Sequence, residues 1–228
     1  MPQALVFGAT GAIGSAVATG LRDAGFAVAG TGRQGGHELL AVDPVEDAES
    51  LAALDGLPAL DAVVWAQGAN VNDSAQEVQA STYEEIMAAN VTYVVATLGH
   101  LLRTERLATP ARMVVISSIW EQVARPGKFS YTVSKAALGG LVRAAAADLA
   151  ADGHLINAVG PGVTDTAMTR AMLSPAQIDG MGDQTGFGRL TALEDVAAMV
   201  VHLCSPDNSG VTGQSIAVDL GFVSGRRL

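Results

Sequence analysis

Short apolar runs alternate with helical patterns along nearly the whole chain of 228 residues. The runs that we interpret as strands cover about residues 3–8, 26–31, 39–42, 60–66, 112–118, 154–160 and 214–219. Helical patterns lie between them, at about residues 12–24, 45–54, 82–104, 131–151 and 191–204. Nearly continuous apolar strands separated by helices are typical of a parallel sheet that is covered on both faces. With right-handed crossovers, this alternation predicts an α/β doubly wound sheet of about seven strands.

The chain is expected to form a single domain over residues 1–228. It is 49% hydrophobic, which is enough to bury a full core, and no linker or repeat divides it. One long segment, at about residues 161–190, shows neither pattern and is rich in Gly, Met and Thr. Because it follows the sixth strand, we expect it at the carboxyl edge of the sheet, where ligands bind. We interpret it as the substrate loop.

The charge of the chain limits its expected partners, and its cysteine content limits its expected compartment. The formal net charge is -10, and the only basic cluster is Arg226-Arg227, so neither nucleic acid nor a membrane surface is an expected partner. The uncharged stretches 3–21 and 86–102 are expected to be buried rather than to span a membrane. The single cysteine, Cys204, excludes an internal disulfide and indicates a cytoplasmic protein. We interpret it as a core residue near a helix end.

A glycine-rich turn joins the first expected strand to the first helix, with the sequence Gly8-Ala9-Thr10-Gly11-Ala12-Ile13-Gly14. Gly8 permits the tight turn, Gly11 lets the backbone approach a phosphate, and Gly14 allows close packing of helix on strand. The alternative is an ordinary Ala/Gly-rich helix start. The position of the turn at the first strand-to-helix junction favours a dinucleotide site and a Rossmann-type sheet.

The end of the second expected strand favours NADP(H) over NAD(H). An NAD site places Asp or Glu there, but this chain reads Thr31-Gly32-Arg33. An arginine without a carboxylate fits a 2′-phosphate, and the alternative is a solvated loop arginine. Asp43, which ends the third strand, is either an acceptor for the adenine amino group or the N-cap of a helix that begins at Pro44.

Four polar residues have the spacing needed for carbonyl chemistry. Tyr131 and Lys135 are four residues apart in a helical stretch, which puts them on one face, and the chain has only two lysines. Ser118 ends an apolar run thirteen residues before Tyr131, and Asn90 lies in an earlier helix. A serine, a tyrosine and a lysine in this arrangement can polarise a carbonyl group and give it a proton, which indicates an oxidoreductase.

Together these motifs resemble the short-chain dehydrogenase/reductase family over nearly the whole chain. The glycine turn, the four polar residues, the segment from Gly160 to Thr166 and the segment from Val211 to Asp219 occur in the family's order. The resemblance implies hydride transfer between a nicotinamide and a carbonyl or secondary alcohol, without a metal. It implies the catalytic residues Asn90, Ser118, Tyr131 and Lys135. It places the cofactor against Gly8, Thr10, Gly11, Ala12, Ile13, Gly14, Arg33, Asp43, Ala66, Gln67, Gly68, Tyr131, Lys135, Pro161, Gly162, Val163 and Thr166.

In this family, the tyrosine is the general acid in reduction and the general base in oxidation. A free tyrosine has a pKa near 10. A cation about 4 Å away contributes on the order of 4 kcal/mol at an effective dielectric of 20, so Lys135 is expected to lower the pKa of Tyr131. Ser118 is expected to hydrogen-bond the substrate oxygen. Asn90 is expected to hold a water that links Lys135 to solvent.

Three positions depart from the family's pattern. Ala12 stands where the glycine turn usually has a glycine, and Gln67 replaces a structural asparagine after the fourth strand. We expect Gln67 or the backbone to take over the contacts of that asparagine. Glu121 replaces a glycine three residues after Ser118. These changes affect cofactor geometry and substrate choice rather than the chemistry.

The substrate pocket is expected to hold a small or medium carbonyl compound under an apolar lid. Its expected residues are Ser118, Trp120, Glu121, Phe129, Met168 and Met172. Glu121 either meets a polar group of the substrate or is a solvated loop residue, and the second alternative is favoured. Trp120 either lines the pocket or packs at a subunit contact.

Two other functions stay open: a regulatory protein that binds NADP without turnover, and a nucleotide-sugar epimerase or dehydratase. The intact polar set argues against the first, and the short C-terminal part argues against the second. The family resemblance also implies a homo-oligomer, a tetramer or a dimer, that is formed through the helices at about 82–104 and 131–151. The small residues of the second helix, among them Gly139, Gly140 and Ala144, either allow such contact or face the sheet.

Overall fold

The computed structural model of the chain describes residues 1–33, 35–36 and 39–225. Seven strands form one parallel sheet in the order β3-β2-β1-β4-β5-β6-β7. They are β1 (Gln3–Phe7), β2 (Ala27–Gly32), β3 (Leu39–Ala41), β4 (Leu60–Trp65), β5 (Leu107–Ile116), β6 (Leu155–Pro161) and β7 (Ser215–Val218). The order reverses between β1 and β4, as in a doubly wound sheet, so the predicted Rossmann-type fold is confirmed.

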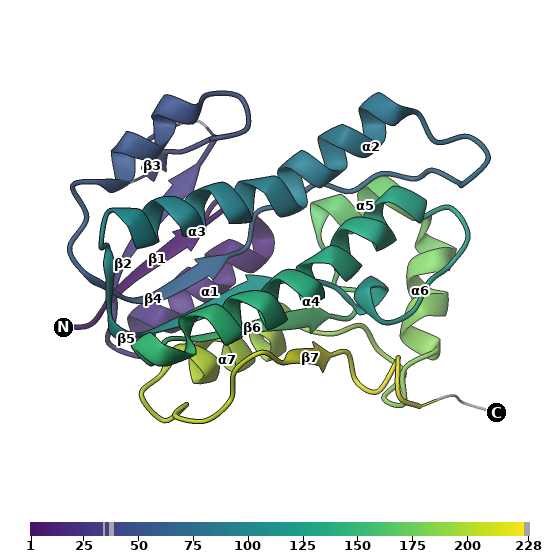
Figure 1. Cartoon of the computed structure of the whole chain (residues 1–228). Coiled ribbons are helices and arrows are strands. Elements are labelled where there is room, and N and C mark those ends of the chain that lie inside the picture. Colours follow the sequence, from purple (N-terminus) through teal and green to yellow (C-terminus); the bar gives the residue numbers. More distant parts are fainter. Residues whose placement is uncertain (34, 37–38, 226–228) are drawn as a thin grey trace.

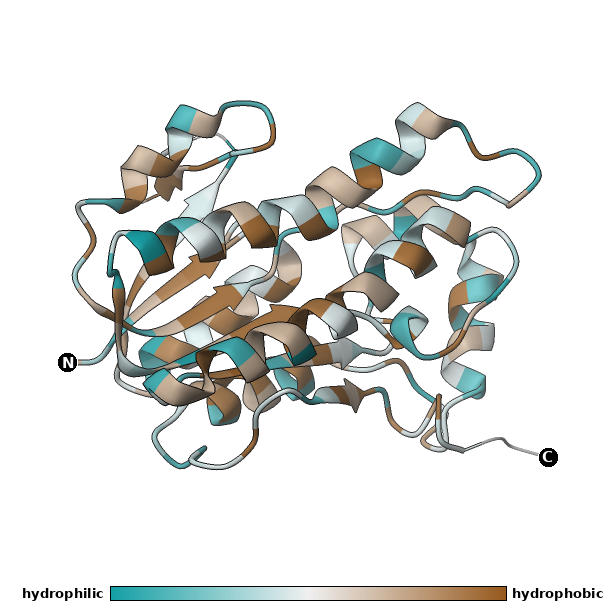
Figure 2. Cartoon of the chain, viewed as in Figure 1, coloured by the Kyte–Doolittle hydropathy of each residue, from teal (hydrophilic) through white to brown (hydrophobic). Residues whose placement is uncertain are grey.

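Helices cover both faces of the sheet (Figure 1). One face carries α1 (Ala12–Asp23) and α7 (Leu193–Cys204), and Val17, Leu21 and Val196 pack there against the strands. The other face carries α2 (Ala80–Met87), the π-helical turn η2 (Ala88–Thr92), α3 (Tyr93–Arg103) and α4 (Phe129–Leu149). The central strands β1 and β4 and the second half of β5 are strongly apolar (Figure 2), because their side chains are buried between the two helix layers.

Several expected boundaries differ from the structure. The fifth strand begins five residues earlier than expected, and the expected helix 45–54 is the shorter 3-10 helix η1 (Ala48–Leu54). The helix 82–104 is interrupted by η2. Residues 161–190, expected to be irregular, contain α5 (Ala167–Met172) and α6 (Pro175–Asp183). The start of α6 has a capping box from Ser174 and Gln177, which the sequence could have revealed.

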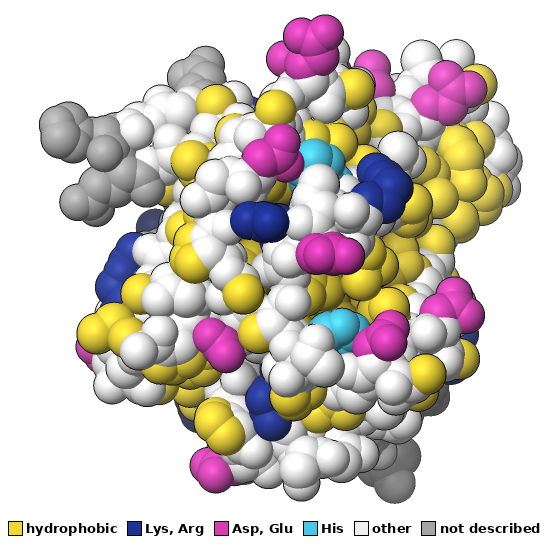
Figure 3. All heavy atoms as spheres, turned by 60° about the vertical axis from the view of Figure 1, so that its left-hand side comes forward, with side chains coloured by type: hydrophobic (Ala, Val, Ile, Leu, Met, Phe, Trp, Pro, Cys, Tyr) yellow, Lys and Arg dark blue, Asp and Glu magenta, His cyan; other side chains and the backbone are white. Residues whose placement is uncertain are grey.

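Shorter helices complete the chain: η3 (Ile119–Glu121) follows β5, and η4 (Ala150–Asp152) follows α4. In the described ranges, the helical segment Ala80–Arg103 is long and apolar enough to cross a membrane by length and composition alone. Its residues Tyr93, Val94 and Leu101 are buried in the hydrophobic core. Cys204 is buried at the end of α7, as predicted. On the face shown in Figure 3, acidic and basic side chains are interspersed.

Candidate active site

A cavity of about 1040 Å³ lies at the carboxyl ends of the central strands. Loops after β1, β4, β5 and β6 contribute its walls, which is where a doubly wound sheet binds its ligand. It brings together most of the residues that the sequence selected: Gly8, Thr10, Gly11, Ala12, Ile13, Arg33, Asp43, Ala66, Gln67, Gly68, Ser118, Trp120, Tyr131, Pro161, Gly162, Val163, Thr166, Met168 and Met172.

The glycine turn is built from close backbone contacts. Gly8 has a φ of +73°, and a Cβ there would lie 2.7 Å from the backbone nitrogen of Gln67. A Cβ on Gly14 would lie 2.1 Å from the carbonyl oxygen of Gly8. Gly14 does not line the cavity, although the resemblance placed the cofactor against it. It lets α1 pack closely on the turn after β1, as the sequence predicted.

The contacts of this turn fit a dinucleotide. Gly11 caps α1 without any side-chain hydrogen bond, so the first amides of the helix face the cavity and are available to a phosphate. Gln67 Oε1 is buried and has no hydrogen-bond partner among the described residues. The Gln67 side-chain oxygen therefore makes none of the contacts of the family's asparagine within the described residues and is left to accept from a ligand, so of the two alternatives the backbone one stays a prediction. The glycine cradle and this acceptor together fit a bound dinucleotide.

Arg33 and Asp43 both line the cavity, where they follow β2 and β3. Arg33 is exposed directly after β2, and together with Thr10 it also lines a smaller neighbouring cavity. Asp43 lines the main cavity but does not cap a helix at Pro44, because the helix begins later and Asp47 caps it. The adenine-contact alternative for Asp43 thus stays a prediction, and the N-cap alternative is wrong.

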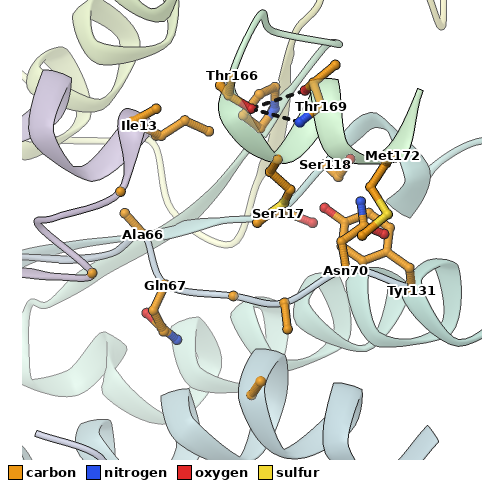
Figure 4. A pocket seen from close by; sticks show the side chains of 18 of the residues that line it. Ile13, Ala66, Gln67, Asn70, Ser117, Ser118, Tyr131, Thr166, Thr169 and Met172 are labelled. Atoms are coloured by element: carbon orange, nitrogen blue, oxygen red, sulfur yellow. Dashed lines mark hydrogen bonds between the residues drawn. The ribbon is translucent and has the colours of Figure 1, made fainter. Parts of the chain in front are cut away.

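Ser118 and Tyr131 lie at the other end of the cavity, away from Ile13, Ala66 and Gln67 (Figure 4). Ser118 follows β5 and caps η3, where its Oγ accepts from the backbone amide of Trp120 at 3.3 Å. Tyr131 lies in the first turn of α4. Two hydroxyl groups from different elements therefore converge on one region of the cavity.

Lys135 lies behind Tyr131 rather than on the cavity wall. Its Nζ donates to the carbonyl oxygen of Ile116 at 3.0 Å and is 5.6 Å from the centre of the Tyr131 ring. Burial lowers the pKa of Lys135 to about 8, and the Glu121 carboxylate acts in the opposite direction. Burial raises the pKa of Tyr131 to about 12, while hydrogen bonding to Ser118 opposes this rise. The expectation of a lowered tyrosine pKa is wrong for the protein alone, because desolvation by burial is the largest influence on Tyr131 and raises its pKa.

Asn90 is buried in η2 and does not touch the cavity. Its Oδ1 accepts from the amide of Ala69 at 2.7 Å, and its Nδ2 donates to Ala69 O and to Ser134 Oγ. All its side-chain contacts thus hold the segment after β4 against α4. Gly68 fits between Asn90 and Lys135, since a Cβ there would lie 2.9 Å from Asn90 Oδ1 and 3.7 Å from Lys135 Nζ.

The segment after β6 closes the cavity from the side. Thr166 caps α5, and its Oγ1 accepts from the amide of Thr169 at 3.2 Å (Figure 4). Met168 is 47% exposed although it lines the cavity, and Met172 and Met181 line it from α5 and α6. This wall is made of flexible apolar side chains, in agreement with the expected substrate segment.

Two expected substrate residues lie elsewhere. Glu121 packs on α4, where its Oε1 would be only 2.2 Å from a Cβ added to Gly139. It faces the helix because Gly139 leaves the space, so neither the substrate-contact nor the solvated-loop alternative describes it. Phe129 begins α4 and is 40% exposed outside the cavity. Trp120 does line the cavity, and its ring packs edge-on against Phe222.

The sequence interpretation missed polar residues of the cavity wall. Asn70, Arg125 and Lys128 line it, as do Glu84 and Glu85 of α2. The rarity of lysine was the available signal, because Lys128 is the only lysine besides Lys135.

The fold and the cavity define a dinucleotide-binding α/β enzyme. Residues 8–223 match a family model described as Enoyl-(Acyl carrier protein) reductase. A cis-4-hydroxycyclohexanecarboxylate dehydrogenase of Sinomonas cyclohexanicum is 32% identical over 241 residues, covering 97% of this chain and 96% of that protein. A 3-oxoacyl-[acyl-carrier-protein] reductase of Vibrio cholerae is 27% identical and covers 96% of both chains.

A structure described as an NAD(P) dependent gluconate 5-dehydrogenase of Beutenbergia cavernae, with bound NADP, superimposes with a TM-score of 0.89. It is 28% identical, and the match covers 98% of this chain and 97% of that one. The chain belongs to the short-chain dehydrogenase/reductase family. It is an oxidoreductase of alcohol and carbonyl groups that uses a nicotinamide dinucleotide.

Proposed function

We propose that this enzyme is an NADP(H)-dependent carbonyl reductase or alcohol dehydrogenase in which Tyr131 transfers the proton. The observation that carries the proposal is the convergence of Tyr131 and Ser118 at one end of the cavity, with the glycine turn at the other. When bound, the dinucleotide supplies or accepts the hydride. In reduction, Ser118 donates a hydrogen bond to the carbonyl oxygen, and Tyr131 gives that oxygen its proton.

Lys135 supports Tyr131 with a buried positive charge. Its Nζ is fixed by the carbonyl of Ile116, so the ammonium stays close to the tyrosine ring. A cation at this position stabilises the tyrosinate that forms when Tyr131 loses its proton. Asn90 keeps the segment after β4 in place behind both residues, and we propose that it acts by positioning this segment.

Arg33 supports the preference for NADP(H). The described residues at the carboxyl end of β2 include no carboxylate, and Arg33 forms none of the ion pairs found in this part of the chain. A 2′-phosphate on the adenine ribose would satisfy its guanidinium. The relative of Beutenbergia cavernae was solved with bound NADP.

Titration with NADPH and NADH, followed by nicotinamide fluorescence, tests the proposal. We expect tighter binding of NADPH, and then turnover in a screen of ketones and secondary alcohols. 4-Hydroxycyclohexanecarboxylate is a suitable first alcohol because a relative is named for it. Preference for NADH would overturn the cofactor proposal alone. Tight binding without turnover of any carbonyl or alcohol would favour the regulatory alternative.

We also propose that the enzyme acts in the cytoplasm as a homotetramer. On α4, Ala136, Ala144 and Ala147 are exposed, and on α3 Val95 is 54% exposed. These small and apolar side chains leave both helices free for close contact with another copy. Light scattering is expected to give the mass of a tetramer, and a monomeric mass would reject this part of the proposal.

A further inference from the structure

Lys128 is a buried cation on the wall of the cavity that the proposed chemistry does not use. Its side chain enters from the residue before α4, and only 3% of the residue is exposed. Nζ donates to Asn70 Oδ1 at 2.7 Å and to the carbonyl oxygen of Val71 at 3.2 Å. An ammonium has three N–H donors, so one donor remains available inside the cavity.

The charge of Lys128 has no ion-pair partner in the described ranges, where the ion pairs join other residues. The pKa of Lys128 is lowered to about 8, mainly by burial and in addition by the Arg125 guanidinium, while the Asp73 carboxylate opposes both. Asp73 is bound elsewhere, because it accepts from the amide and the hydroxyl of Ser130. A buried cation with two neutral partners is unfavourable unless an anion joins it.

Arg125 brings a second cation to the same part of the cavity. Its guanidinium lies 5.6 Å from the centre of the Trp120 ring, which holds it on the cavity wall. Two cations from the loop between η3 and α4 therefore face the end of the cavity that contains Ser118 and Tyr131.

We propose that Lys128 and Arg125 form a subsite for a carboxylate of the substrate. The substrate class is then an oxo acid in reduction and a hydroxy acid in oxidation. This inference rests on the proposed oxidoreductase function, and it adds the group that the enzyme recognises beside the reacting carbonyl.

Distance favours a carboxylate in the same small molecule. Lys128 Nζ lies 5.6 Å from the centre of the Tyr131 ring, whose hydroxyl reaches the reacting oxygen. A bound anion is thus separated from the reacting carbon by only a few bonds. The phosphate of a pantetheine thioester is many bonds away from its carbonyl, so it does not fit between these two residues.

Matched pairs of acid and ester test the subsite. Straight-chain oxo acids of increasing length, 4-oxopentanoate among them, are compared with their methyl esters by kcat/KM with NADPH. For the best pair we expect the acid to be preferred roughly 10- to 100-fold, as for a charge-assisted hydrogen bond. Lys128→Met is expected to remove most of this preference, and Lys128→Arg to keep part of it. A structural role of Lys128 would lower both rates and leave their ratio. The control Arg103→Gln, an exposed cation at the end of α3, should not change the ratio.

Binding to the complex with NADP⁺ gives a readout that needs no turnover. Pentanoate should bind and pentanamide should not, as measured by calorimetry, and Lys128→Met should abolish the difference. Equal binding of both compounds, or an acid-to-ester ratio near one in the native enzyme, would overturn the subsite. Preference for inorganic phosphate over pentanoate would overturn it in favour of a phosphorylated substrate. If pentanoate binds but no carbonyl is reduced, the proposed function fails while the subsite stands.

Discussion

The two ends of the cavity differ in whether backbone or side chains shape their walls. At the dinucleotide end, the glycine turn is formed by backbone, with Gly8 and Gly14 so close to their neighbours that no Cβ fits. The substrate end is made of side chains, among them the methionines of α5 and α6 and the cations of the loop before α4. Backbone geometry fixes one ligand, whereas side chains can be exchanged without changing the fold. This difference explains how relatives with the same fold are named for unlike substrates.

Tyr131→Phe tests whether the two ends act independently, and it has the largest expected effect. Removal of the hydroxyl eliminates the proton donor, so we expect kcat to fall about 1000-fold. The NADPH dissociation constant should change little, because the dinucleotide end is untouched. Steady-state kinetics and fluorescence titration measure the two effects. Tyr83→Phe in α2 is the matched control and should retain full activity, since Tyr83 lies outside the cavity. Substantial turnover by Tyr131→Phe would mean that another group carries the proton.

Gly14→Ala tests the backbone-built end. The new Cβ would lie 2.1 Å from Gly8 O, and this clash with backbone cannot be relieved by a side-chain rotation. We expect a loss of about 3 kcal/mol in the free energy of unfolding, together with weak NADPH binding. Denaturant titration measures the stability. Gly56→Ala is the control, because its Cβ meets nothing within 4 Å. Equal stabilities of the two variants would show that the turn tolerates a side chain at Gly14 and does not depend on close backbone contact.

The same difference between the two ends explains what the sequence could predict. Glycine spacing and strand alternation are local patterns, so the sheet and the turn were predictable. The convergence of Ser118 and Tyr131 was predictable from their spacing together with the family resemblance. The direction of a side chain in a loop depends on its neighbours in space. Glu121 turns toward α4 because Gly139 leaves room there, and Lys128 reaches the cavity because Asn70 and Val71 O receive its ammonium. Gly139 is far from Glu121 in sequence, and Asn70 and Val71 are far from Lys128, so no local pattern indicates these contacts.

Lys135→Met tests the buried charge at the substrate end through the pH dependence of stability. The folded pKa of about 8 lies below the ordinary value of 10.5. Between these values the unfolded chain binds more protons, so the free energy of unfolding rises with pH. From pH 8 to 10 we expect this rise to be smaller in Lys135→Met than in the native protein by roughly 2 kcal/mol. Tyr131, with its pKa raised to about 12, acts in the opposite direction only above this range. Denaturant titrations without cofactor measure the rise, and equal rises in both proteins would contradict a buried, charged Lys135.

Arg33→Ala has the smallest expected effect. It tests whether the Arg33 side chain gives the dinucleotide end its proposed preference for NADP(H) over NAD(H). Arg33 is exposed, so its contact with a 2′-phosphate is partly screened by solvent. We expect the NADPH dissociation constant to rise about 10-fold while that of NADH stays unchanged. Arg22→Ala, in the last turn of α1 and outside the cavity, is the control. Fluorescence titration at low and high salt measures both constants, and the NADPH preference should shrink with salt only when Arg33 is present. An equal loss for both nucleotides would place Arg33 in the general support of the turn, and specificity would then have to come from the backbone itself.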